Sequence, residues 1–141
     1  MEIEIFRKTK KRIEKSFVEK VVRKTLTASG KKAAAFSVSV VFLDKVQIRE
    51  MNRKYRKIDK ATDILSFDYS LGYNKGKGEG ELFLCPELIE KSAKENKVSF
   101  RKELAFVLSH GVLHLLGFRH GKKMYELQDT VSSKFKYQNA K

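Results

Sequence analysis

Cysteine and long apolar runs are scarce in this sequence, and each scarcity narrows what the protein can be. The one cysteine, Cys85, cannot form an internal disulfide, which fits a reducing compartment such as the cytoplasm. Apolar runs fall short of the ~20 residues that a membrane-spanning helix needs. Residues 1–12 carry acids and then bases without the continuous apolar core of a signal peptide. We therefore expect a cytoplasmic protein that does not use a membrane.

Acidic residues are also in the minority. The 31 lysines and arginines outnumber the 17 aspartates and glutamates, so the formal net charge is +14. A positive field of this size attracts polyanions, nucleic acid first among them, although the same charge could serve solubility alone. Hydrophobic residues make up 41% of the chain, which excludes a largely disordered protein.

Residues 1–141 are predicted to form a single α+β domain, since the chain shows no internal repeat and no linker. Alternating patterns indicate strands at 2–6, 36–43, 62–69 and 81–85. The last two are expected to form a hairpin around a Gly- and Lys-rich loop at 70–80. Helical periodicity and capping residues indicate helices at 10–28, 44–57, 86–96, 100–116 and 123–137. The order β-α-β-α-β-β-α-α-α favours a mixed sheet packed against helices.

All three histidines of the protein lie within the segment Ser109–Gly121. His110 and His114 are four residues apart, so on a helix both imidazoles leave the same face. Gly117 can adopt the left-handed conformation that ends a helix, and the chain can then fold back to bring His120 toward the other two. Three neutral imidazoles suit a divalent transition metal, and zinc is the first expectation, with nickel or copper also possible. Such a site leaves a coordination position for water or substrate.

The spacing His-x3-His-x2-Gly-x2-His is also that of the metzincin zinc proteases, in which a glutamate follows the first histidine as general base. This chain has Gly111 there, so a protease is not expected, and we interpret the glycine as room for a substrate to approach closely. Two alternatives stay open. The histidines could be ordinary surface or core residues, or the metal could be structural, which would usually require a fourth protein ligand that is not evident in the sequence.

The segment His-Gly-Val-Leu-His-Leu-Leu-Gly-Phe-Arg-His at 110–120 resembles the signature of the YbeY family, bacterial metal-dependent endoribonucleases of ribosomal RNA maturation. A second segment, 52–67, is similar to the family stretch Asn-x-x-Tyr-Arg-x-x-Asp-x-x-Thr-Asp/Asn-Val-Leu-Ser-Phe. The resemblance covers most of residues 36–121. It departs from the family at Arg119, where aspartate is usual, and at Asp68, where the family has proline.

The resemblance implies a four-stranded sheet with helices and a metal site at one end, here on a central helix and the turn after it. It also implies a zinc-dependent endoribonuclease that prefers single strands and acts in ribosomal RNA processing and ribosome quality control. Its partners would be ribosomal RNA and components of the small ribosomal subunit. In the family, the arginine after the tyrosine of the second segment is needed for RNA cleavage, and the matching residue is Arg56. A guanidinium can hold a phosphate through two parallel hydrogen bonds.

Arg119 has two interpretations. An aspartate there could orient a ligating imidazole, which an arginine cannot do, so another acid such as Asp63, Asp68 or Glu103 would do so, or none would. Alternatively, Arg119 contacts a phosphate beside the metal.

Other questions also stay open from the sequence. The nucleophile could be a water activated by the metal or the 2′-hydroxyl of the RNA itself. The oligomeric state is undetermined. Two other functions compete with the nuclease: a basic RNA- or ribosome-binding protein with a structural zinc, and a metal hydrolase acting on another substrate.

Overall fold

The computed structural model describes residues 2–30, 36–69 and 79–135. Within these ranges the chain forms four strands and five helices in the order expected from the sequence. The strands are β1 (Glu2–Arg7), β2 (Ser37–Phe42), β3 (Ile64–Asp68) and β4 (Glu79–Leu84). The helices are α1 (Lys15–Ser29), α2 (Lys45–Arg56), α3 (Pro86–Glu95), α4 (Phe100–Leu115) and α5 (Lys122–Ser133).

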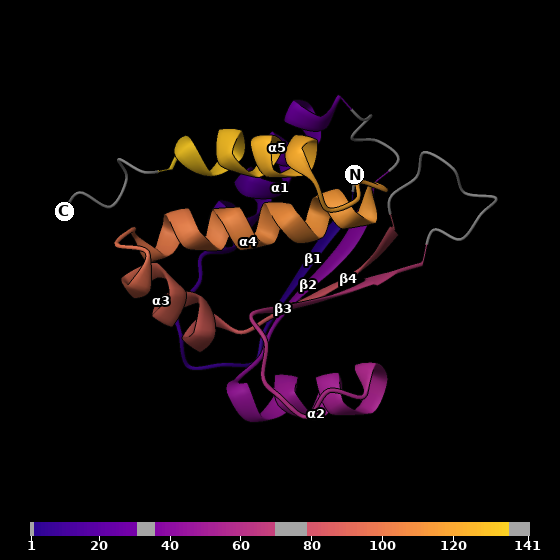
Figure 1. Cartoon of the computed structure of the whole chain (residues 1–141), viewed down its shortest axis with the longest axis vertical. Coiled ribbons are helices and arrows are strands. Elements are labelled where there is room, and N and C mark those ends of the chain that lie inside the picture. Colours follow the sequence, from indigo (N-terminus) through magenta and orange to yellow (C-terminus); the bar gives the residue numbers. More distant parts are fainter. Residues whose placement is uncertain (1, 31–35, 70–78, 136–141) are drawn as a thin grey trace.

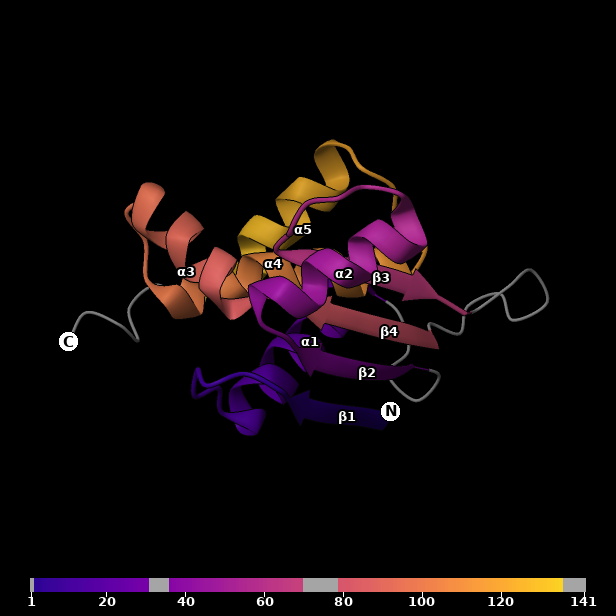
Figure 2. The same ribbon diagram turned by 90° about the horizontal axis from the view of Figure 1, so that it is seen from below.

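The four strands form one mixed sheet in the order β1-β2-β4-β3. β1 pairs with β2 and β2 pairs with β4 in parallel, whereas β3 runs antiparallel to β4. The predicted α+β fold with a four-stranded mixed sheet is therefore confirmed. β3 lies at one edge of this sheet, and that position matters for the site described below (Figure 2).

The helices cover the two faces of the sheet unequally. α1, α4 and α5 lie on one face, and α2 lies on the other (Figure 1). α4 is the central helix, because it contacts α1, α3 and α5 as well as β3 and β4. Most of the buried residues of α4 are apolar, as the sequence indicated, with Glu103 and Ser109 the polar ones. Within the described ranges, no helix has both the length and the apolar character needed to cross a membrane.

Two apolar clusters hold these layers together. The larger cluster fills the space between the sheet and the helices α1, α4 and α5, with Phe36, Phe42, Leu108 and Phe135 among its buried members. The smaller cluster lies under α2 and includes Cys85, which is fully buried. Burial raises the pKa of the Cys85 thiol, so this cysteine is a packing residue rather than a nucleophile.

Capping residues define the start of two helices as the sequence predicts. Asp44 and Gln47 form a reciprocal capping box at α2, and the Ser99 hydroxyl accepts a hydrogen bond from Lys102 N at the start of α4.

The predicted start of the first helix at residue 10 is wrong, because α1 begins at Lys15. Before it, Thr9 Oγ1 accepts a hydrogen bond from Lys11 N, a local bond that competes with helical pairing. The Gly- and Lys-rich loop predicted at 70–80 lies largely outside the described residues, since 70–78 are not among them.

Candidate metal centre

The three histidines meet where α4 ends and the chain reverses direction. α4 continues to Leu115, and Gly117 then adopts the left-handed conformation with φ of 92°. Gly117 N donates to the His114 carbonyl at 3.0 Å, and Phe118 N donates to the Leu113 carbonyl at 3.0 Å. These bonds close the helix end and turn the chain back, as expected for a glycine in this conformation.

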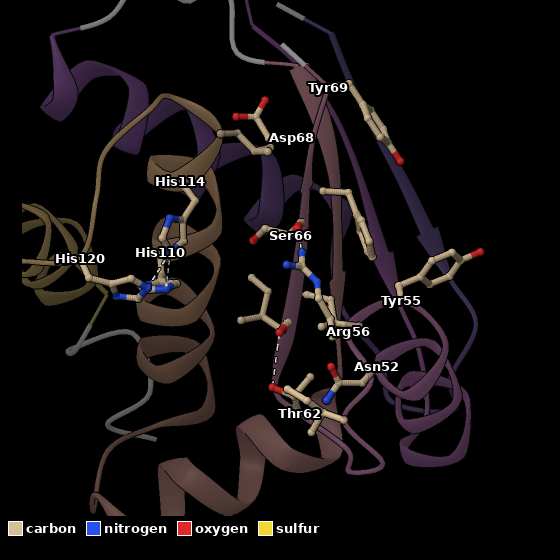
Figure 3. Close-up of a pocket in the computed structure, with 15 residues that line it drawn as sticks. Asn52, Tyr55, Arg56, Thr62, Ser66, Asp68, Tyr69, His110, His114 and His120 are labelled. Carbon is tan, nitrogen blue, oxygen red and sulfur yellow. Dashed lines mark hydrogen bonds between the residues drawn. The ribbon is translucent and has the colours of Figure 1, made fainter. Parts of the chain in front are cut away.

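The imidazoles of His110, His114 and His120 converge as predicted (Figure 3). Nε2 of His114 lies 3.0 Å from Nε2 of His110 and 3.1 Å from Nε2 of His120. A tetrahedral zinc with Zn–N bonds of about 2.0–2.1 Å separates its ligand atoms by roughly 3.3 Å, so this spacing fits a divalent ion. Among the residues that the structure describes, no cysteine or carboxylate joins the group. The donor set therefore corresponds to an open site rather than to a closed structural one.

The surroundings favour the neutral form of two of these imidazoles. Burial lowers the pKa of His110, and burial together with the neighbouring His110 and His120 lowers the pKa of His114. A lowered pKa leaves the ring uncharged at neutral pH, with one nitrogen lone pair available. Both rings are thus prepared to ligate a cation without first losing a proton.

Gln128 on α5 orients the first of these rings. Its Nε2 donates to the Phe106 carbonyl at 3.2 Å, which turns its Oε1 toward Nδ1 of His110, also at 3.2 Å. Nδ1 therefore carries the proton, and the lone pair of Nε2 points into the histidine cluster. The sequence left open whether another acid or no residue orients a ligating imidazole, and for His110 the structure shows a third arrangement, an amide. Glu103, one of the acids considered, instead accepts hydrogen bonds from Ser92 and Asn96.

The sequence carries a signal for Gln128, although no motif includes this residue. Gln128 is only 5% exposed and follows the same face of α5 as Met124 and Val131. A polar side chain within an apolar helical stripe needs a buried hydrogen-bond partner. The partner could not be named from the sequence, since it lies on a different helix.

Replacing Gln128 by leucine is expected to weaken zinc binding by about 10- to 100-fold, as losing a partner of a ligating histidine typically does. The affinity can be measured by competition with a chelator of known zinc affinity. Ser132→Ala is the matched control, because Ser132 is also polar and buried on α5 but bonds only to the Asp129 carbonyl in the described contacts. Unchanged zinc affinity in Gln128→Leu would refute the orienting role.

The interpretation of Gly111 as room for a substrate is wrong. A Cβ at this position would lie 2.7 Å from Cδ1 of Ile64 and 2.8 Å from Cδ2 of Leu82. Gly111 therefore faces the sheet, where α4 packs closely on β3 and β4. The position that holds the catalytic glutamate in metzincins is occupied here by a glycine that packs against the sheet. A glutamate side chain has no room there, which explains its absence.

A cleft of about 930 Å³ connects the histidines with the second predicted motif. One wall consists of His110, His114 and His120, and the opposite wall comes from the end of α2, the segment after it, and β3 (Figure 3). Arg56, the last residue of α2, lines this opposite wall. The structure thus brings two segments separated by about forty residues, 52–67 and 110–120, into one cleft, as the resemblance implied.

Two contacts hold the Arg56 side chain in place. Its guanidinium donates to the Ser66 carbonyl of β3 and stacks over the Phe67 ring at 5.1 Å from the centroid. The bond to Ser66 uses one of the five N–H donors of the group. The arginine is therefore held at the edge of the sheet with donors remaining for an anion in the cleft.

Arg119 occupies a different position. It is exposed in the turn that precedes His120, and it is not among the residues that line the cleft. Asp68 ends β3 opposite Gly80 and does line the cleft, so the aspartate that replaces the family's proline is still accommodated as the last residue of the strand.

Comparison with known proteins supports the resemblance over nearly the whole chain. The family model described as Endoribonuclease YbeY matches residues 3–136. A Thermosipho melanesiensis protein named Endoribonuclease YbeY is 34% identical over 137 residues, which cover 90% of this chain and 91% of the relative. A Bdellovibrio bacteriovorus protein of the same name is 33% identical over 143 residues, with 93% of each chain covered. The solution structure of a Thermotoga maritima protein matches with a TM-score of 0.66 at 29% identity, covering 94% of this chain and 87% of that one.

Proposed function

Since this chain belongs to the YbeY family of endoribonucleases, we propose that it is a metal-dependent endoribonuclease that cleaves single-stranded segments of ribosomal RNA. His110, His114 and His120 would hold the metal, with zinc the first expectation and nickel or another divalent transition metal possible. Arg56 would hold the phosphate at the cleaved bond. The net charge of +14 suits a polyanionic substrate.

One observation supports this proposal above the others: three converging imidazoles and one oriented arginine share a single cleft. When bound, zinc would supply Lewis-acid stabilisation of charge on the phosphoryl group and would make a water more acidic. The chain's own contribution is positional. Gln128 keeps the proton of His110 on Nδ1, and the turn at Gly117 places His120 beside His114.

Arg56 would act on the phosphate itself. Its guanidinium is oriented by the Ser66 carbonyl and by the Phe67 ring, so few rotamers have to be frozen when an anion binds. Two parallel N–H donors can bind two oxygens of one phosphate and offset the negative charge that grows during cleavage. This is a role that a single ammonium group does not reproduce.

Arg56→Lys is therefore expected to lower the cleavage rate by about 10²- to 10³-fold, the range seen when a donor to developing charge is lost. The measurement is the initial rate on a labelled single-stranded RNA at saturating metal. Arg53→Ala is the control, since Arg53 lies on the same helix but pairs with Glu50 and does not line the cleft. A lysine variant with the wild-type rate would exclude a bidentate role for Arg56.

A basic RNA- or ribosome-binding protein with a structural zinc is the alternative function. Within the described part of the chain the donor set has three members, which argues against it, because structural zinc is usually closed by four protein ligands. Incubation of the purified protein with single-stranded RNA, with and without a chelator, separates the two. Cleavage that stops on chelation while the protein stays folded supports the nuclease, whereas RNA binding without cleavage and unfolding on chelation support the alternative.

The remaining parts of the proposal concern the setting of the reaction. We place the protein in the cytoplasm, acting as one domain of residues 1–141 in ribosomal RNA maturation and ribosome quality control, with small-subunit components as partners. Arg119, which directly precedes His120, is proposed as an extra phosphate contact beside the metal. Trapping the product distinguishes the two nucleophiles, since a 2′,3′-cyclic phosphate end at early times would indicate attack by the RNA's own 2′-hydroxyl.

A further inference from the structure

Two tyrosines line the same cleft and yet leave about half of their surface exposed. Tyr55 on α2 is 54% exposed and Tyr69, directly after β3, is 49% exposed. Large rings of this kind are normally placed so that their apolar faces are covered. Neither ring belongs to the histidine cluster, and the described contacts of the Arg56 guanidinium are to Ser66 and Phe67 rather than to either tyrosine. The exposure of the two rings inside the cleft therefore requires its own explanation.

Contacts with the protein hold both rings in defined positions. The Tyr55 ring meets Phe67 edge to face at 5.6 Å between centroids, and Phe67 meets Phe83 in the same way at 5.7 Å. The Tyr69 hydroxyl donates to Glu81 Oε1 at 2.6 Å. That bond to Glu81 raises the pKa of Tyr69 to about 12, which is the direction expected when the protonated hydroxyl donates to a carboxylate. Both rings are thus anchored at one end while the rest of their surface faces solvent.

The two rings stand on the other side of β3 from the histidines. Ile64 packs against the cluster under α4, and Phe67 packs against the cluster under α2. Since successive side chains of a strand point to opposite faces, Ser66 and Asp68 share the α4 side with Ile64, and Tyr69, directly after the strand, continues the α2 side of Phe67. Figure 3 shows Tyr55 and Tyr69 on that second side, with Arg56 and Ser66 between them and the histidines. Because β3 is an edge strand, no further strand among the described residues separates the two sides.

Positive charge accompanies the aromatic rings. The Lys54 ammonium lies 5.2 Å from the centroid of the Tyr55 ring, and Arg56 follows directly in the sequence. Aromatic rings that alternate with cations are typical of surfaces that bind single-stranded nucleic acid, where bases stack on the rings and phosphates meet the cations. Protein interfaces also favour tyrosine and arginine, but they are depleted of lysine, and here the Lys54 ammonium lies over the Tyr55 ring.

We propose that Tyr55 and Tyr69 are a stacking platform for unpaired bases next to the phosphate held by Arg56. The inference rests on the proposed function and adds to it the means by which the protein recognises single strands. An RNA strand would cross the open edge of β3, with its phosphate at Arg56 and the adjoining bases on the two rings. Bases inside a duplex are already stacked and paired, so they cannot reach these rings.

The test measures RNA binding by the full chain as purified, and cleavage of the same RNA is followed in a separate reaction. Fluorescence anisotropy would give the affinity for a labelled single-stranded oligoribonucleotide and for the same oligonucleotide with abasic positions. Tyr55→Ala and Tyr69→Ala are expected to weaken binding of the intact RNA by about 10- to 100-fold, the effect of losing a stacked base. Tyr55→Phe should bind normally, because stacking needs the ring and not the hydroxyl.

Tyr125→Ala is the matched control, since Tyr125 is 61% exposed on α5 but does not line the cleft. The abasic RNA should bind the wild-type protein weakly and should not discriminate between wild type and Tyr55→Ala. Equal preference for intact over abasic RNA in wild type and in both alanine variants would overturn the platform. If the wild-type protein cleaves RNA but the alanine variants keep the wild-type preference for intact over abasic RNA, only this inference fails. If the wild type neither binds nor cleaves RNA, the proposed function fails with it.

Discussion

Replacing His114 by alanine is expected to release the metal and to abolish RNA cleavage. His114 is the middle donor, since its Nε2 lies within 3.1 Å of the corresponding atoms of both His110 and His120. Its loss would leave only two imidazoles and would remove the nitrogen that lies close to both of them. Changes in residues that merely orient a ligand cost about 10- to 100-fold in metal affinity, so loss of a ligand should exceed about a hundredfold. Metal analysis of the purified variant and its cleavage rate on single-stranded RNA measure the two effects.

Arg119→Asp is the matched control for metal content. Arg119 is exposed, directly precedes His120 and does not ligate the proposed ion, so this variant should keep its metal. Loss of the metal in Arg119→Asp would show that the turn depends on this side chain. A His114→Ala protein with one equivalent of metal would contradict the three-histidine site. Cleavage by a metal-free His114→Ala preparation would point to a contaminating nuclease.

Placing the metzincin glutamate at position 111 is expected to unfold the protein rather than to create a protease. Even the Cβ of alanine would lie less than 3 Å from the side chains of Ile64 and Leu82. Overpacking of this kind costs about 1–3 kcal/mol. A glutamate would also bring an unpaired carboxylate into an apolar interface, which costs several kcal/mol more. Since a domain is stable by only about 5–15 kcal/mol, Gly111→Glu should be largely unfolded.

Chemical denaturation followed by circular dichroism measures this effect. Gly111→Ala should show an intermediate loss of stability, because its methyl group displaces only the ends of two side chains. Val46→Glu is the control, since Val46 is 77% exposed on α2 and should tolerate a charge. A folded Gly111→Glu protein of wild-type stability would show that α4 does not pack on the sheet as described.

Short-range patterns were sufficient for much of the fold. The spacing of His110 and His114, the left-handed residue Gly117 and the capping box at Asp44 depend on neighbours within a few residues. Each of these therefore appears in the structure as predicted. The exception at the start of α1 has the same local origin, because the hydrogen bond to Thr9 competes with the first helical turn.

Resemblance to a family supplied what local patterns could not. No periodicity connects Arg56 with the histidines, and only the matching segments at 52–67 and 110–120 indicated that the two belong to one site. The structure places both in one cleft, which agrees with that expectation.

The tertiary structure alone decided which side chains support the site. Gln128 reaches His110 from another helix, Gly111 faces the sheet, and Tyr55 and Tyr69 share the cleft with Arg56. These relations depend on the face that α4 presents to α5 and to β3, and on β3 being the edge strand. Sequence patterns report the dihedral preferences and apolar period of one segment at a time. The contacts between segments arise only when the whole core packs at close density, so they are properties of the folded chain.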